Sequence, residues 1–149
     1  MNKFNILTFF ICLFLTGNVH SAQYEVKMLS SGNGGSMVFE PPVIKIQPGD
    51  SIKWLNANPG HNTVSINEMI PSGAKTWNGK MNEEIVVEFT EEGVYGYKCA
   101  PHYILGMVGL VIVGNPESNL EQSKGFAEQA QSKFAMNKNR FSEYFSLIK

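Results

Sequence analysis

Turn residues interrupt residues 24–113 at short intervals, and this punctuation excludes long helices over most of the chain. The segments between the turns are short and apolar, and several alternate with polar residues: 24–28, 37–39, 43–46, 51–55, 85–90, 94–98 and 108–113. Such alternation is typical of strands with one buried face. It predicts a two-sheet sandwich or barrel over about residues 23–114. The side chains expected to face inward are Ile52, Trp54, Ile85, Val87 and Phe89.

The periodicity of the sequence changes after Gly114. Asn115 and Pro116 form a helix-start signal, a capping residue followed by proline in the first turn. Further along, four apolar residues recur at the spacing of one helix face: Phe134, Phe141, Phe145 and Ile148. We expect a helical tail over about residues 115–149, with helices near 116–124 and 127–148. These helices would cover apolar surface of the sandwich within a single domain of residues 22–149.

Residues 1–21 have the pattern of a secretory signal peptide. A basic start at Lys3 precedes an apolar run over residues 4–15, and small residues follow it. The apolar run is too short to cross a membrane. Cleavage after Ser21 suits the small-residue rule better than cleavage after Ala22, which stays open as an alternative. We therefore expect an exported protein without a membrane anchor in its mature form.

Removal of the signal peptide changes the chemistry of the chain. It takes away Lys3 and no acidic residue, so the formal net charge goes from −1 to −2. It also leaves Cys99 as the only cysteine, with His61 and His102 as the only histidines. A lone thiol in an oxidising compartment cannot form an internal disulfide, but a bound metal would both protect and use it. The near-neutral charge argues against nucleic acid as a partner.

Cys99, His102 and Met107 form the pattern C-x2-H-x4-M in a loop between two predicted strands. With the residue frequencies of this chain, His and Met fall at these offsets by chance about once in a thousand. A cysteine, two histidines and a weak methionine are the ligands of a blue-copper electron-transfer site, and His61 supplies the second histidine. Zinc also accepts cysteine and histidine, but methionine is a poor zinc ligand. Nucleophilic catalysis is disfavoured, because no acidic residue is obviously placed to orient a base.

At these residues the sequence resembles the cupredoxins, and among them the pseudoazurins. The resemblance extends over essentially the whole mature chain, through motifs at residues 37–41, 48–50, 60–62, 69–71, 93–99, 101–103 and 106–109. It implies a cupredoxin-like all-β Greek-key sandwich of about eight strands with two C-terminal helices, which holds one type 1 copper ion per chain. The ligands implied by position are His61, Cys99, His102 and Met107.

The resemblance also implies a function. It predicts a monomeric periplasmic protein, not an enzyme, that carries one electron at a time by cycling between Cu(I) and Cu(II). The implied partners are redox proteins, a respiratory reductase such as nitrite reductase or a cytochrome, that dock near His102. His102 is expected at an apolar surface as the electron port, with His61 more enclosed and Met37 near the His102 ring. Two other functions stay open: a copper storage or delivery protein, and a β-sandwich with a vestigial site.

Three residues beside the ligands carry further expectations. Asn62 follows His61, so its backbone N–H can point at the Cys99 sulfur and its side chain can tie the two ligand loops together. Ala100 has no hydroxyl, so any such side-chain bond must use the backbone there. Pro101 has no N–H and cannot donate a second bond to the sulfur, which favours a lower reduction potential.

The charge around the expected port departs from the pattern that the resemblance implies. Lys80, Lys98 and Lys124 remain of a basic rim, whereas Ser31 and Asn33 stand where relatives often have lysine. With a net charge of −2 for the mature chain, electrostatic steering of an acidic partner should be weaker.

Overall fold

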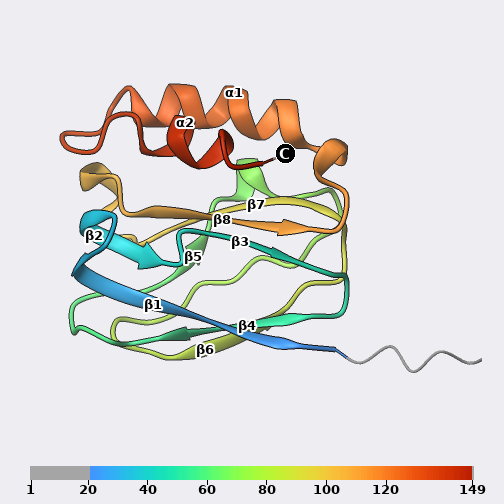
Figure 1. Ribbon diagram of the computed structural model, residues 1–149, viewed down its shortest axis with the longest axis horizontal. Helices are drawn as coiled ribbons and strands as arrows, with labels where there is room; N and C mark the ends of the chain where they lie inside the picture. The colour runs from blue at the N-terminus through green and yellow to red at the C-terminus, as the bar shows by residue number, and fades with distance from the viewer. Residues whose placement is uncertain (1–20, 149) are drawn as a thin grey trace, which may run out of the picture.

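Two four-stranded sheets form the body of the computed structural model, which describes residues 21–148. One sheet has the order β2-β1-β4-β6 and the other β3-β8-β7-β5 (Figure 1). The strands are β1 (Gln23–Gly32), β2 (Gly35–Glu40), β3 (Val43–Ile46), β4 (Ser51–Leu55), β5 (Val64–Ser65), β6 (Ile85–Glu88), β7 (Gly93–Lys98) and β8 (Val108–Val113). The sequence did not signal β5, whose two residues are too few to carry a pattern.

Each sheet is mixed. β1 pairs in parallel with β4, and β3 pairs in parallel with β8, whereas the remaining pairings are antiparallel. Parallel neighbours require connections that cross between the sheets, so the chain alternates between the two layers. The predicted fold class, an all-β sandwich of eight strands with two C-terminal helices, is confirmed.

Alternation along β7 and β8 assigns their side chains to two cores. Tyr95 and Tyr97 face the space between the sheets, where they pack with Trp54, while Val94 faces the opposite side. The same rule puts Val111 between the sheets and leaves its neighbours on the outer face. The inward side chains predicted from the sequence all contribute to the inter-sheet core, with Ile52, Trp54 and Phe89 buried and Ile85 and Val87 packed against them.

The outer face of the second sheet is covered by the C-terminal tail (Figure 1). A short 3-10 turn, η3 (Pro116–Ser118), precedes α1 (Leu120–Gln131) and α2 (Arg140–Phe145). Their apolar side chains meet those of the sheet in a second buried cluster, formed by Val94, Leu110, Ile112, Ala127, Phe134, Phe141, Tyr144 and Phe145, among others.

The bounds predicted for the two helices were wrong. Residues 125–131 continue α1 through the expected break, and residues 132–139 are not α-helical, although a continuous helix was expected there. Two features end the helical path before α2. Asn137 has a φ of 51°, which a right-handed helix excludes, and Ala135 donates its N–H to the carbonyl of Ile104 at 2.7 Å. Phe134 nevertheless reaches the same buried cluster as Phe141.

The proposed signal peptide falls almost entirely outside the described residues, since the description begins at Ser21. Within residues 21–148, every helix falls short of the length and apolar character needed to cross a membrane.

Candidate metal centre

Strand alternation places Cys99 and Met107 at one end of the inter-sheet core. Cys99 continues the inward series of β7, and Met107 begins the inward series of β8, so both side chains are fully buried in the same cluster. Their backbones are adjacent as well, because the Cys99 N–H donates to the Met107 carbonyl at 3.0 Å. The two sulfur-containing residues of the motif therefore meet where the two strands pair.

The loop between these strands folds back to carry His102 toward Cys99. The His102 N–H donates to the Cys99 carbonyl at 3.2 Å, and the His102 carbonyl accepts from the Met107 N–H at 3.1 Å. The short 3-10 helix η2 (Tyr103–Leu105) fills the loop and ends at Gly106, whose φ of 75° favours glycine. These backbone bonds fix the positions of Cys99, His102 and Met107 relative to one another in space.

His61 enters from a separate loop after β4. Asn82 holds this loop on both sides, because its side-chain oxygen accepts from the Gly60 N–H and its own N–H donates to the His61 carbonyl. On the far side of the ring, the Ser30 hydroxyl lies 3.0 Å from Nε2 of His61. This contact turns Nδ1 of His61 toward the centre. Nothing in the sequence pattern pointed to Ser30 or Asn82, because both act through contacts between distant segments.

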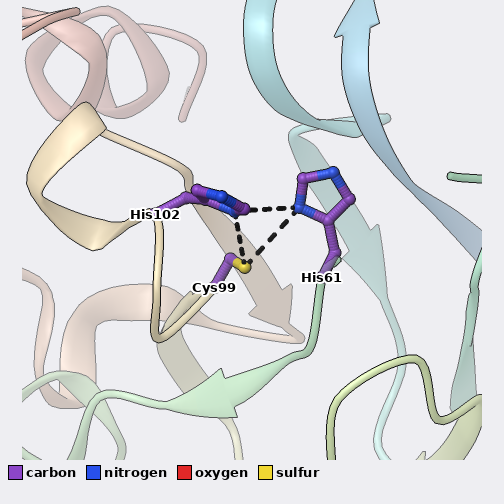
Figure 2. Close-up of side chains that lie close together, drawn as sticks. All are labelled: His61, Cys99 and His102. Atoms are coloured by element: carbon purple, nitrogen blue, oxygen red, sulfur yellow. Dashed lines mark hydrogen bonds between the residues drawn. The ribbon is translucent and has the colours of Figure 1, made fainter. Parts of the chain in front are cut away.

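Three donor atoms converge at this point (Figure 2). Nδ1 of His61 and Nδ1 of His102 lie 3.1 Å apart. The Cys99 sulfur is 3.7 Å from the first nitrogen and 3.4 Å from the second. Within residues 21–148 these three residues form the one cluster of histidine, cysteine and acidic side chains with the geometry to hold a metal ion.

The donor set fits a first-row transition metal. Bonds of about 2.0–2.3 Å from one ion to imidazole nitrogen and thiolate sulfur require donor separations of roughly 3–4 Å. The three observed separations lie in this range. Lone pairs that face one another this closely repel unless a proton or a cation lies between them. Soft sulfur with imidazole is the combination that suits copper.

Burial sets the protonation chemistry of the centre. It lowers the pKa of His61, and the neighbouring His102 lowers it further, so the imidazole is held neutral as a metal ligand requires. Burial raises the pKa of the Cys99 thiol, whereas the backbone N–H groups of Asn62 and His102 oppose that rise. A metal must therefore displace the thiol proton when it binds. The sequence anticipated the Asn62 donor, whereas the contribution of the His102 N–H was not foreseen.

Asn62 joins the two ligand loops, as the sequence predicted. Its side-chain oxygen accepts from the Ala100 N–H at 2.8 Å, which is the backbone contact expected for a residue without a hydroxyl. Its side-chain nitrogen donates to the Gly79 carbonyl at 3.0 Å. The side chain is buried together with its bond to Gly79, whereas the bond from exposed Ala100 is only partly shielded from water.

The exposed side of the centre is the His102 side. His61 has only 1% of its surface exposed, whereas His102 is half-buried, as expected. Exposed Ala100 and Pro101 precede His102, and Ile104, with 53% of its surface exposed, follows it. An apolar hollow of about 260 Å³ separates this loop from α1, and its lining includes Tyr103, Ile104, Phe126 and Phe134.

The predicted basic residues contribute unequally. Lys80 is exposed, and the ammonium of Lys98 lies 4.6 Å above the ring of Tyr103, next to His102. Lys124 instead forms an ion pair with Glu121 at 2.9 Å, so its charge is largely offset. Lys133, which is not part of the predicted basic rim, lines the apolar hollow beside the loop.

Comparison with known proteins gives a consistent picture. The profile of the family "Copper binding proteins, plastocyanin/azurin family" matches residues 26–114. The chain is 52% identical to a pseudoazurin of Methylorubrum extorquens over 68% of its own length and 69% of that protein, and 43% identical to one of Paracoccus pantotrophus over 70% and 72%. The solved structure of a Sinorhizobium pseudoazurin superposes with a TM-score of 0.77 at 41% identity, covering 86% of this chain and 97% of that one.

Proposed function

This chain belongs to the plastocyanin/azurin family of copper-binding electron-transfer proteins, and from that premise we propose that it carries single electrons between redox proteins in the periplasm. The observation that carries the proposal is the convergence of two imidazole nitrogens and one thiol sulfur at one end of the buried core. The proposed ligands of one type 1 copper ion are His61, Cys99, His102 and Met107.

Each proposed ligand has a distinct part. Copper supplies the one-electron couple between Cu(I) and Cu(II). Cys99 provides the thiolate, and the N–H groups directed at its sulfur disperse part of the negative charge. His61, held by Ser30 and its loop, provides an imidazole whose direction is fixed before metal binds. Met107 is proposed as a weak axial ligand because its buried side chain shares the cluster of Cys99.

His102 is the proposed electron port. Its ring combines a donor atom at the centre with partial exposure, whereas the other histidine is enclosed. Apolar residues before and after it would let a partner exclude water from the contact. A short path from metal to surface through one imidazole suits electron transfer and requires no substrate pocket.

Burial distinguishes this proposal from copper storage or delivery. An exchangeable site needs ligands that an acceptor can reach, whereas His61, Cys99 and Met107 are all buried. The purified copper protein should show an intense visible band and a reversible one-electron couple. Cys99→Ser should lose the band, because the charge transfer requires sulfur bound to Cu(II). A colourless protein that gives its copper readily to a chelator would establish the delivery function instead.

The axial assignment has its own test. Met107→Gln should retain copper and lower the reduction potential, because a harder oxygen ligand favours Cu(II). Val111→Leu, at an inward position of the same strand, is the control for altered packing in the cluster. If the glutamine variant keeps the parent spectrum and potential, Met107 is a packing residue and not a ligand.

The proposed partner is an acidic redox protein such as a nitrite reductase or a cytochrome. Lys80, Lys98 and Lys133 provide positive charge, and the mature net charge of −2 keeps the overall attraction small. The reaction rate should therefore fall only shallowly as salt rises. A rate that increases with salt would indicate a partner of like charge. Detection of the mature protein in a periplasmic fraction, with sequencing of its N-terminus, tests export and cleavage after Ser21.

A further inference from the structure

Three consecutive carbonyls of the loop that bears the proposed ligands accept hydrogen bonds from the segment between α1 and α2 and from the start of α2. Ala135 N–H donates to the Ile104 carbonyl at 2.7 Å. The Asn137 side chain donates to Leu105 at 2.8 Å, and Arg140 donates to Gly106 at 2.8 Å. Met107 follows directly. We call the three donor residues, Ala135, Asn137 and Arg140, the loop clamp.

Arg140 extends the clamp to a second part of the molecule. The Nη1 atom that contacts Gly106 also donates to the Met37 carbonyl at 2.7 Å. Nη2 donates to the carbonyls of Gly34 and Ser36 at 3.2 and 3.1 Å. One side chain thus ties the start of α2 to the loop before Met107, to the β1–β2 turn and to the start of β2. Met37 packs against the cluster that contains Cys99 and Met107, and it has a φ of 52°, which is unusual for a residue with a side chain.

The Arg140 guanidinium is a buried charge that meets no acidic partner among the residues that the structure describes. Arg140 has 4% of its surface exposed and makes no ion pair with any acidic group in residues 21–148. Its four contacts are all neutral carbonyls, and a buried cation is costly unless its environment compensates for lost water. Carbonyl dipoles provide such compensation, but they leave the net positive charge in place. The remaining positive charge interacts electrostatically with any nearby group whose charge changes, such as a metal ion that is oxidised or reduced.

We propose that Arg140 is a positioning residue of the metal centre, which fixes the loop between His102 and Met107 and raises the reduction potential through its buried charge. The inference rests on the proposed copper function. The oxidised centre carries one more positive charge than the reduced centre, so a fixed neighbouring cation disfavours oxidation. A low-dielectric surrounding strengthens that effect relative to a surface charge. Because hydrogen bonds to a charged donor are stronger than neutral ones, the same residue also holds the loop in place.

The positioning part is tested on metal-free protein by amide hydrogen exchange at Leu105, Gly106 and Met107. Arg140→Met should accelerate exchange at these amides by at least about tenfold, since a bond to a charged group contributes more than that to an opening equilibrium. Asn137→Gly removes one clamp donor while permitting the left-handed backbone, so it gives a milder variant if Arg140→Met fails to fold. If loop exchange in Asn137→Gly equals that of the parent protein, the clamp does not hold the loop.

The charge part is tested on copper-loaded protein by voltammetry. Arg140→Met should lower the potential by about 59 mV, which corresponds to a tenfold change in a one-electron equilibrium. Arg140→Lys keeps the positive charge but loses the planar arrangement of guanidinium donors. It should therefore loosen the loop and lower the reduction potential less than Arg140→Met does. Lys138→Met removes an exposed charge from the same segment and should leave the potential unchanged.

The outcomes separate the inference from the function on which it rests. Failure of the parent protein to form a coloured copper site would overturn the proposed function, whereas the exchange experiment still decides whether the clamp holds the loop. If Arg140→Met and Lys138→Met shift the potential equally, the buried charge has no special effect on the metal. If Arg140→Met and Arg140→Lys lower the reduction potential by the same amount, the loop geometry and not the charge of Arg140 determines the potential.

Discussion

Asn62→Ala tests whether a single buried side chain joins the two ligand loops. The substitution removes the hydrogen bond that the side chain accepts from the Ala100 N–H and the one that it donates to the Gly79 carbonyl. The Gly79 carbonyl lies in a buried residue and would be left without this donor, whereas Ala100 is exposed and its N–H can bind water instead.

The expected loss follows from this asymmetry. An orphaned buried polar group costs about 1–3 kcal/mol, and a bond replaced by water costs about 1 kcal/mol or less. The sum is a loss of about 1–4 kcal/mol in the free energy of unfolding, with its centre near 2–3 kcal/mol. For a domain of this size, the urea midpoint should fall by about 1–2 M.

The measurement is urea unfolding of the metal-free protein, so that lost copper affinity does not contribute to the result. Asn58→Ala is the matched control, because Asn58 also accepts one backbone bond and donates another, but both lie at the exposed surface. It should cost less than about 1 kcal/mol. Equal midpoints for the two variants would refute the argument that burial makes the Asn62 bonds a strong link between the loops.

Three further predictions concern acid, the tail and the loop. The carboxylate of Asp50 accepts backbone N–H bonds from Ala22 and Gln47, which lower its pKa. Its contribution to stability should therefore be present above about pH 4 and be lost as the pH falls through the lowered pKa. Asp50→Asn should flatten this acid dependence of stability in unfolding curves. Phe141→Ala should cost about 3–5 kcal/mol in chemical unfolding because Phe141 is fully buried under the tail, whereas Leu147→Ala, at an exposed position, should cost little. Gly106→Ala should reduce the thermal midpoint of metal-free protein, because φ is 75° and an added Cβ would lie 3.0 Å from the Asn137 Cβ; an unchanged midpoint would contradict the crowding of the loop against the clamp.

The sequence predicted those parts of the structure that depend on local periodicity or on a short motif. The strands β7 and β8 were predicted from short apolar runs bounded by turn residues. Both runs are apolar at successive positions, so which face Cys99 and Met107 take is known only from the structure. The pairing of His102 with Cys99 depends on a spacing of three residues, which the loop geometry preserves. These features can be predicted because each is determined within a few residues of chain.

Contacts between distant segments could not be predicted in this way. Ser30 meets His61 across 31 residues of sequence, and the carbonyls that surround Arg140 belong to segments about 34 and 105 residues before it. An arginine near the C-terminus carries no local sign that its partners will be neutral carbonyls instead of acids. The break between α1 and α2 has the same origin, because Ala135 gives its N–H to the ligand loop and not to a preceding helical turn.

The error in the helix bounds therefore bears on function. A continuous helix over residues 127–148 would satisfy its own backbone groups, so Ala135 would have no N–H free for Ile104. The two shorter helices still cover the outer face of the sheet, since Phe134 and Phe141 reach one cluster from different segments. Interrupting the helix thus preserves the burial of apolar surface while it releases polar groups toward the loop before Met107. The tail combines two tasks that one regular helix could not perform together: it covers the sheet, and it binds the loop that carries the proposed ligands.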